Sequence, residues 1–204
     1  MFEPAVPFCA RVLSRFSLAA TFATLFVGRS PPLHAQVVTR VSVGPAGEEA
    51  NDVSQESRIS ADGRFVAFTS LASNLVLMPR RPVVQVFVRD LANGTTEIVS
   101  VATSGAVADA SSWDSALSTD GRFVAFSSDA TNLVPDDTNG ATDVFVRDRL
   151  AGTTERVSTF TRGEQGNFTS GAPAISGGGR FVAFESLADN LVVSDTNNVR
   201  PISS

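Results

Sequence analysis

The chain has 204 residues, of which 43% are hydrophobic, and it carries a formal net charge of −5 with one cysteine and one histidine. Because the charge is negative and the basic residues do not cluster, the electrostatics exclude nucleic acid as a partner. A single cysteine excludes an internal disulfide, so apolar packing must hold the chain together.

Residues 1–35 have the layout of a secretory signal peptide. Arg11 and Arg15 make the start basic, an apolar run follows at 16–27, and a stretch with two prolines leads to Ala35. We expect cleavage after Ala35, which places the mature chain in the periplasm or outside the cell. A retained membrane anchor is the alternative, but the apolar run is shorter than the about 20 residues that span a bilayer.

Cleavage after residue 35 removes Cys9 and His34, the only cysteine and the only histidine of the chain. Without histidine the mature chain can form neither a Ser-His-Asp triad nor a histidine-based zinc site. Without cysteine it has no thiol nucleophile. We therefore expect the mature chain not to be an enzyme.

One short segment occurs three times. It is Ser-Ala-Asp-Gly-Arg-Phe-Val-Ala-Phe at 60–68 and Ser-Thr-Asp-Gly-Arg-Phe-Val-Ala-Phe at 118–126, and a third copy at 176–184 has glycines in the turn. The copies start 58 residues apart, and Val-Phe-Val-Arg-Asp at 86–90 and 144–148 has the same spacing. Self-similarity at a fixed period indicates a repeat fold.

Each repeat predicts four short antiparallel strands. Asp-Gly between apolar runs favours a hairpin because glycine accepts a positive φ, and Phe and Val suit a pleated surface. Repeated four-stranded units are typical of a β-propeller, whereas helical repeats need apolar residues at a different spacing. In the second repeat we expect strands at 114–118, 122–128, 143–149 and 154–159.

The Ser-x-Asp-Gly-Arg-Phe-Val-Ala-Phe segment resembles the core of the PD40, or WD40-like, propeller repeat. That repeat occurs in the propeller domain of the periplasmic TolB protein and in uncharacterised exported bacterial proteins, whose version the segment from Asp137 to Asp148 resembles. The resemblance covers roughly residues 37–204. It implies an all-β fold of four-stranded blades, and it implies no particular activity because propellers have unrelated functions.

In this register the chain contains an incomplete propeller of about two and a half blades. The third strand of the last blade should start near Pro201, where the sequence no longer matches the repeat. Propellers close with about four to eight blades. The chain is therefore either a fragment of a longer protein, which we favour, or a unit that self-assembles. We expect a blade-completing strand at 37–43, blade one at 58–101, blade two at 114–159 and a truncated blade three at 172–204.

The loop at 135–143 is the candidate metal site. Asp137, Asn139 and Asp143 place oxygen ligands at alternating positions around a glycine, as a hard cation such as Ca²⁺ requires. The alternative, which we favour, is a solvated turn in which Asp and Asn bond the backbone. No complete copy of this ligand set occurs in the other two repeats.

The remaining candidates are repeated carboxylates and one aromatic residue. Asp62 and Asp120 lie in hairpin turns, and Asp90 and Asp148 end third strands beside arginines. Their repetition favours bonds to turn amides and ion pairs inside each blade, because one active site needs only one set of residues. Trp113 has no aromatic counterpart, and we expect it to fill a gap between blades, with a binding aromatic near the channel as the alternative.

These observations predict an exported, non-enzymatic β-propeller module that binds or scaffolds a protein or glycan partner, with no membrane span after signal cleavage. Two other hypotheses stay open. The chain could be the propeller part of a larger exported hydrolase whose catalytic residues lie elsewhere. It could also be a surface protein that Ca²⁺ stabilises.

Overall fold

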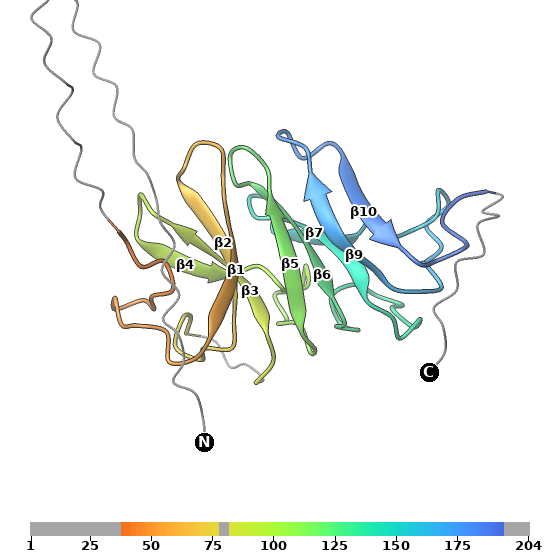
Figure 1. Cartoon of the computed structure of the whole chain (residues 1–204). Helices are drawn as coiled ribbons and strands as arrows, with labels where there is room; N and C mark the ends of the chain where they lie inside the picture. The colour runs from red at the N-terminus through yellow and green to blue at the C-terminus, as the bar shows by residue number, and fades with distance from the viewer. Residues whose placement is uncertain (1–37, 78–81, 194–204) are drawn as a thin grey trace, which may run out of the picture.

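The computed structural model describes residues 38–77 and 82–193. Every regular element in these ranges is a β-strand (Figure 1). Neither range contains a helix that is long and apolar enough to cross a membrane. The signal peptide predicted at 1–35 lies outside the described residues. The described strands are β1 (Ser54–Ile59), β2 (Phe65–Ser70), β3 (Gln85–Asp90), β4 (Thr95–Ile98), β5 (Ser112–Leu117), β6 (Phe123–Ser128), β7 (Asp143–Asp148), β8 (Thr153–Arg156), β9 (Ser170–Ile175) and β10 (Val182–Ser186).

The strands form three antiparallel sheets that stand side by side (Figure 1). Blade one has the strand order β1-β2-β3-β4, and blade two has the order β5-β6-β7-β8. Blade three contains β9 and β10 within the described residues, and the third strand expected near Pro201 falls outside them. Neighbouring sheets contact each other through the first strands β1, β5 and β9. The chain is thus an all-β, incomplete propeller whose sheets do not close into a ring.

The repeated Asp-Gly turn forms as the sequence predicts. Ser118 Oγ donates a hydrogen bond to Asp120 Oδ1 at 2.7 Å, and the same oxygen accepts the amide of Arg122 at 3.0 Å. Gly121 has a φ of 67°, a conformation in which a side chain would be strained. Asp62 binds its own turn in the same way. The structural role expected for Asp62 and Asp120 is confirmed.

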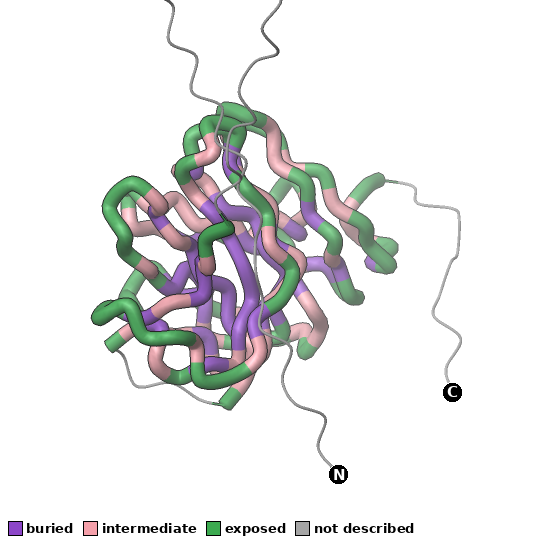
Figure 2. The backbone as a smooth tube through the Cα atoms, turned by 60° about the vertical axis from the view of Figure 1, so that its left-hand side comes forward, coloured by how far each residue is buried: buried purple, intermediate pink, exposed green. Residues whose placement is uncertain are grey.

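The apolar core lies between the blades. Ala67 and Val88 of blade one pack against Val124 and Phe126 of blade two in one buried cluster. Phe126 stacks on Phe145 at 5.9 Å between ring centroids, and the same stack repeats in blade one. Figure 2 shows the buried positions concentrated along the strands of the first two blades, with exposed turns around them. The period-58 apolar pattern therefore describes faces that stack from blade to blade.

The first strands begin earlier than expected. β1 starts at Ser54 and β5 at Ser112, ahead of residues 58 and 114. The register of each pair shifts inside the first strand, where Glu56 and Asp114 have φ values of 53° and 51°. Such a β-bulge interrupts the alternation of apolar and polar side chains. The first residues of β1 and β5 therefore cannot be read from the alternation of apolar and polar residues.

The blade-completing strand expected at 37–43 stays a prediction, and residues 38–43 form no strand with the described residues. Val43 makes one isolated bridge with Glu49. The equivalent strands β4 and β8 exist because they pair with β3 and β7. No such third strand lies beside residues 38–43 in the described part of the chain. The segment still contributes to packing, because Val41 is fully buried in the apolar cluster of blade one.

Candidate functional site

The first strands of all three blades carry the same backbone irregularity. Glu56, Asp114 and Ala172 have φ values of 53°, 51° and 50°, although none of them is glycine. Non-glycine residues in this region are strained and occur often at ligand sites. The amide of Asp114 donates to Glu56 Oε2 at 3.2 Å, which links β5 to β1. The neighbouring first strands β1, β5 and β9 therefore each carry one bulge.

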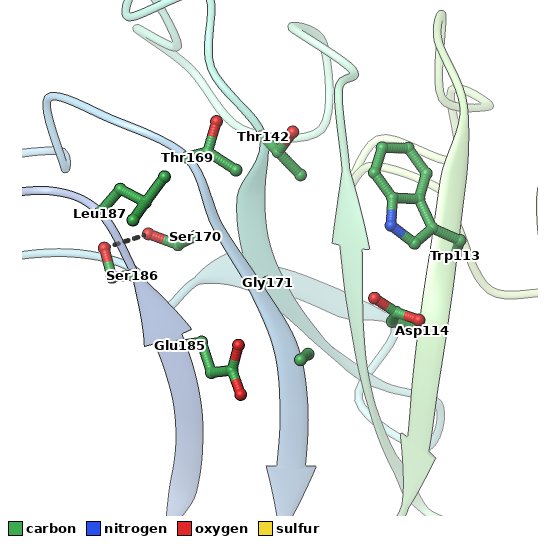
Figure 3. Close-up of a pocket in the computed structure, with 10 residues that line it drawn as sticks. Trp113, Asp114, Thr142, Thr169, Ser170, Gly171, Glu185, Ser186 and Leu187 are labelled. Atoms are coloured by element: carbon green, nitrogen blue, oxygen red, sulfur yellow. Dashed lines mark hydrogen bonds between the residues drawn. The ribbon is translucent and has the colours of Figure 1, made fainter. Parts of the chain in front are cut away.

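A cavity of about 480 Å³ lies at the bulges of blades two and three (Figure 3). Trp113 and Asp114 line it from β5, and Glu185 lines it from β10. Figure 3 shows Trp113 and Asp114 together on one side of the strand that carries Gly171, and Glu185 on the other side. Serine and threonine hydroxyls and a few residues without polar side chains complete the wall. The remaining lining residues are Thr142, Thr169, Ser170, Gly171, Ala172, Ser186 and Leu187.

Gly171 helps to leave this cavity open. It takes the place in β9 that Trp113 has in β5, and it pairs directly with Glu185 across the β9–β10 ladder. A side chain at position 171 would meet Ser127 Oγ, which is buried and has no hydrogen-bond partner among the described residues. The same repeat position therefore holds a large side chain in blade two, Trp113, and no side chain in blade three, Gly171. The missing side chain leaves room for the cavity.

Two carboxylates line the cavity, and the described part of the chain places no cationic partner on either of them. Among the described residues, neither Asp114 nor Glu185 takes part in an ion pair. Glu185 stands where blades one and two have Thr69 and Ser127. A carboxylate that breaks a repeat of hydroxyl residues is the signal by which the sequence could have revealed this site.

Trp113 has features of both roles that the sequence allows, which are filling a gap between blades and binding a ligand. It is half-buried, and it lines the cavity between blades two and three. Its ring is thus partly packed and partly open to the cavity (Figure 3). The sequence identified the residue, but not the two carboxylates beside it.

The structure brings Asp137, Asn139 and Asp143 together around a guanidinium. Arg156 Nη1 lies 3.1 Å from Asp137 Oδ1 and 3.2 Å from Asp143 Oδ2. Asn139 Nδ2 donates to Asp143 Oδ2 at 2.9 Å, and Ser158 Oγ donates to Asp143 Oδ1 at 2.5 Å. Burial raises the pKa of the Asp137 carboxyl, and Arg156 opposes that shift.

Arg156 therefore stands where a metal ion would contact the two carboxylates. Its counterpart in blade one is Ile98, and that of Asp143 is Gln85, so blade one lacks the charged pair. Within the described residues no group of three or more His, Cys, Asp or Glu side chains could hold a metal ion. The calcium site at residues 137–143 stays a prediction, and the contacts give the loop a structural partner instead.

Asp90 and Asp148 form the ion pairs expected inside the blades, but with arginines that the sequence did not point to. Arg64 binds Asp90 through Nε and Nη2, at 3.1 and 2.7 Å. Asp90 also accepts two amides of the following turn. The hydrogen bond from Arg64 is the main cause that lowers the pKa of Asp90 to about 2. The neighbouring Arg89 donates to a threonine hydroxyl.

Comparisons with protein families and with curated proteins find no match to this chain. Solved structures with similarity include TolB from Acinetobacter baumannii, at 18% identity and a TM-score of 0.41, over 67% of this chain and 27% of that one. A protein described as TolB from Agrobacterium tumefaciens has 18% identity and a TM-score of 0.45, over 76% and 44%. The GH74 enzyme of Niastella koreensis has 12% identity and a TM-score of 0.39, over 61% and 17%.

The aligned part of this chain spans less than half the length of each of these proteins. The fold assignment rests on the sheets themselves, and the site must be judged from its own geometry.

Proposed function

We propose that the chain is an exported, non-enzymatic β-propeller segment that binds a cationic organic ligand in the cavity beside Trp113. One observation carries the proposal. The cavity is lined by an indole ring and by two carboxylates, Asp114 and Glu185, that have no ion-pair partner within residues 38–77 and 82–193. An ammonium or guanidinium group is the chemistry that satisfies all three.

The physical basis is the attraction of a cation to both kinds of group. The face of a Trp ring attracts a cation, more strongly where water is partly excluded. Carboxylates add charge-assisted hydrogen bonds, which are stronger than neutral ones. A cavity of about 480 Å³ lies in the usual size range for small ligands or for one side chain of a peptide. The threonine and serine hydroxyls supply further acceptors.

Export and the absence of catalysis rest on the sequence. Residues 1–35 have the signal-peptide layout, and residues 38–193 contain neither histidine nor cysteine. A nucleophile activated by histidine and a thiol nucleophile are thus missing from the described ranges. These points support a binding role for this segment.

Trp113 makes the test direct, because it is the only tryptophan. We expect its fluorescence to change in a saturable way with N-acetyl-lysine amide, and not with the uncharged norleucine analogue. Glu185→Gln should weaken binding about tenfold, the loss expected for one charge-assisted contact. Glu155→Gln, a change at an exposed carboxylate, is the matched control and should leave binding unchanged. Equal affinity for the charged and uncharged ligands would overturn the proposal.

Glycoside hydrolases also use a pair of carboxylates beside a cavity as their catalytic residues. The same protein should therefore be incubated with aryl glycosides. We expect no release of the aryl group. Turnover that disappears in Glu185→Gln would overturn the non-enzymatic part of the proposal and leave the location of the site intact.

A further inference from the structure

Gly171 in β9 is a glycine that its own backbone does not require. Its φ lies outside the left-handed region that favours glycine, whereas Gly179 in the following turn has a φ of 72°. Apart from its chain neighbours, a Cβ atom at position 171 would lie within 4 Å of one described atom, Ser127 Oγ, at 3.4 Å. Glycine inside a strand costs stability, because it loses more conformational freedom on folding than any other residue. Neither turn geometry nor tight packing accounts for this glycine.

The other two blades carry a large side chain at the same repeat position. Gln55 and Trp113 occupy it in β1 and β5, so the fold accepts a side chain there. A glycine within a strand often marks a place where a ligand approaches the backbone closely. Gly171 lines the cavity, and it therefore gives the cavity wall a stretch of bare backbone.

Two carboxylates flank this bare backbone. Glu185 is the direct partner of Gly171 in the β9–β10 ladder, so its side chain leaves the sheet on the face where a side chain at position 171 would stand. Asp114 belongs to β5, which contacts β9 from blade two. The two carboxylates lie on opposite sides of the strand that carries Gly171 (Figure 3). A cation that lies against Gly171 thus has a carboxylate on each side.

A guanidinium group suits two opposed carboxylates better than an ammonium group does. The guanidinium is planar, and its N–H donors point outward along more than one edge, so that it can bind carboxylates on two sides at once. An ammonium is a compact point charge. A guanidinium also stacks on aromatic rings such as the indole of Trp113. A flat group can approach the strand closely only where no side chain stands in its way.

The chain itself contains both kinds of guanidinium contact. Arg156 Nη1 contacts two carboxylates, both from the loop at 137–143, at 3.1 and 3.2 Å. The guanidinium carbon of Arg122 lies 4.7 Å from the ring centroid of Phe123, while the same group binds Asp148 through two nitrogens. The contacts that a bound guanidinium would make in the cavity are therefore ones that this fold already forms.

We propose that the cavity is selective for a guanidinium group, such as that of an arginine side chain, and that Gly171 determines this selectivity. The inference rests on the proposed function, because it names which cation the same cavity binds. The guanidinium lies against the bare backbone at Gly171, with one edge toward Asp114 and another toward Glu185. A side chain at position 171 holds the plane away from the strand and prevents the contact with both carboxylates.

The test compares three ligands on the purified chain, with Trp113 fluorescence and calorimetry as readouts. N-acetyl-arginine amide carries a guanidinium, N-acetyl-lysine amide carries an ammonium, and N-acetyl-citrulline amide has an uncharged group of nearly the same shape as the guanidinium. We expect the arginine ligand to bind about tenfold more tightly than the lysine ligand, the gain from one more charge-assisted contact. The citrulline ligand should give no saturable change.

Gly171→Ala tests the residue itself. It should weaken binding of the arginine ligand about tenfold and change that of the lysine ligand by less than about twofold, so that the preference disappears. The melting temperature should stay the same or rise, because alanine has less conformational freedom to lose than glycine. Gly178→Ala is the matched control, at an exposed glycine with open space around its Cβ position and no positive φ. It should leave both affinities unchanged.

Three results would overturn the selectivity and leave the proposed function standing. The first is equal affinity of the wild type for the arginine and lysine ligands. The second is a preference for arginine that survives in Gly171→Ala. The third is a Gly171→Ala variant with a lower melting temperature and equal losses for both cations, which would show that the glycine serves packing. If neither cation binds, or if citrulline binds as tightly as arginine, the proposed function fails as well.

Discussion

Arg64 and Asp90 form a two-point ion pair that joins the turn before β2 to the end of β3, with Nε–Oδ1 at 3.1 Å and Nη2–Oδ2 at 2.7 Å. The pair repeats in blade two between Arg122 and Asp148. It explains why arginine follows Asp-Gly in both complete blades. The arginine ties its own hairpin to the next one in the same sheet.

The first prediction concerns pH. The carboxyl of Asp90 has its pKa lowered from 3.8 to about 2, first by Arg64 and then by the amides of the turn. Its stabilisation is therefore complete above the pKa of the unfolded chain and is lost as the pH falls toward about 2. Asp90→Asn should lower the free energy of unfolding by about 2 kcal/mol at neutral pH. Urea unfolding across pH should show the difference shrinking in acid, and a constant difference would contradict it.

The second prediction compares equivalent phenylalanines. Phe126 is fully buried and stacks on Phe145, whereas Phe184 is half-buried. Phe126→Ala should cost about 3–5 kcal/mol, the usual range for a buried ring. Phe184→Ala should cost well under half of that, because less apolar surface leaves water there. Chemical denaturation measures both, and equal costs would show that blade three is covered as fully as blade two.

The third prediction concerns the loop at 137–143. Arg156→Gln leaves Asp143 buried without its cation and should cost about 3–5 kcal/mol, the loss expected when one partner of a buried pair is removed. Millimolar Ca²⁺ should leave the melting temperature of the wild type unchanged, because the guanidinium stands between the carboxylates. Millimolar Ca²⁺ should raise the melting temperature of the Arg156→Gln variant. A wild-type shift that EDTA reverses would restore the calcium hypothesis.

The fourth prediction concerns export. Expression of the chain in a bacterium with its own N-terminus should give an exported product that starts at Gln36. The measurement is the intact mass of the protein in the periplasmic or culture fraction. An Ala35→Asp variant should accumulate uncleaved, because signal peptidases need a small residue before the cut. A wild-type chain that keeps Met1 and stays in the cell would contradict the signal peptide.

Much of the fold could be predicted because the information is local and repeated. The hairpin turns and the Phe-Val strands such as residues 123–128 depend on neighbours in sequence. The strand segment occurs three times and the Asp-Gly turn twice, which makes both easy to recognise. The starts of β1 and β5 could not be predicted, because the bulges at Glu56 and Asp114 break the alternation. Residues 38–43 have no third strand beside them in the described part of the chain, and no local pattern reports whether a pairing partner is present.

The sites were harder because they join distant segments. Arg64 meets Asp90, and Arg156 meets Asp143, only after the strands have paired in register. Glu185 replaces a hydroxyl residue of the other two repeats, and such a change inside a strand does not by itself indicate a site. It does so only once the structure places Glu185 beside the cavity. Trp113 could be singled out because it is unique.

The most direct test of the central claim is an NMR titration of the Trp113 indole N–H, the only such resonance in the protein. Addition of N-acetyl-lysine amide should move this resonance in a saturable way, and the shift should be absent in the Asp114→Asn, Glu185→Gln double variant. A resonance that stays in place while calorimetry reports binding would show that the ligand site lies elsewhere.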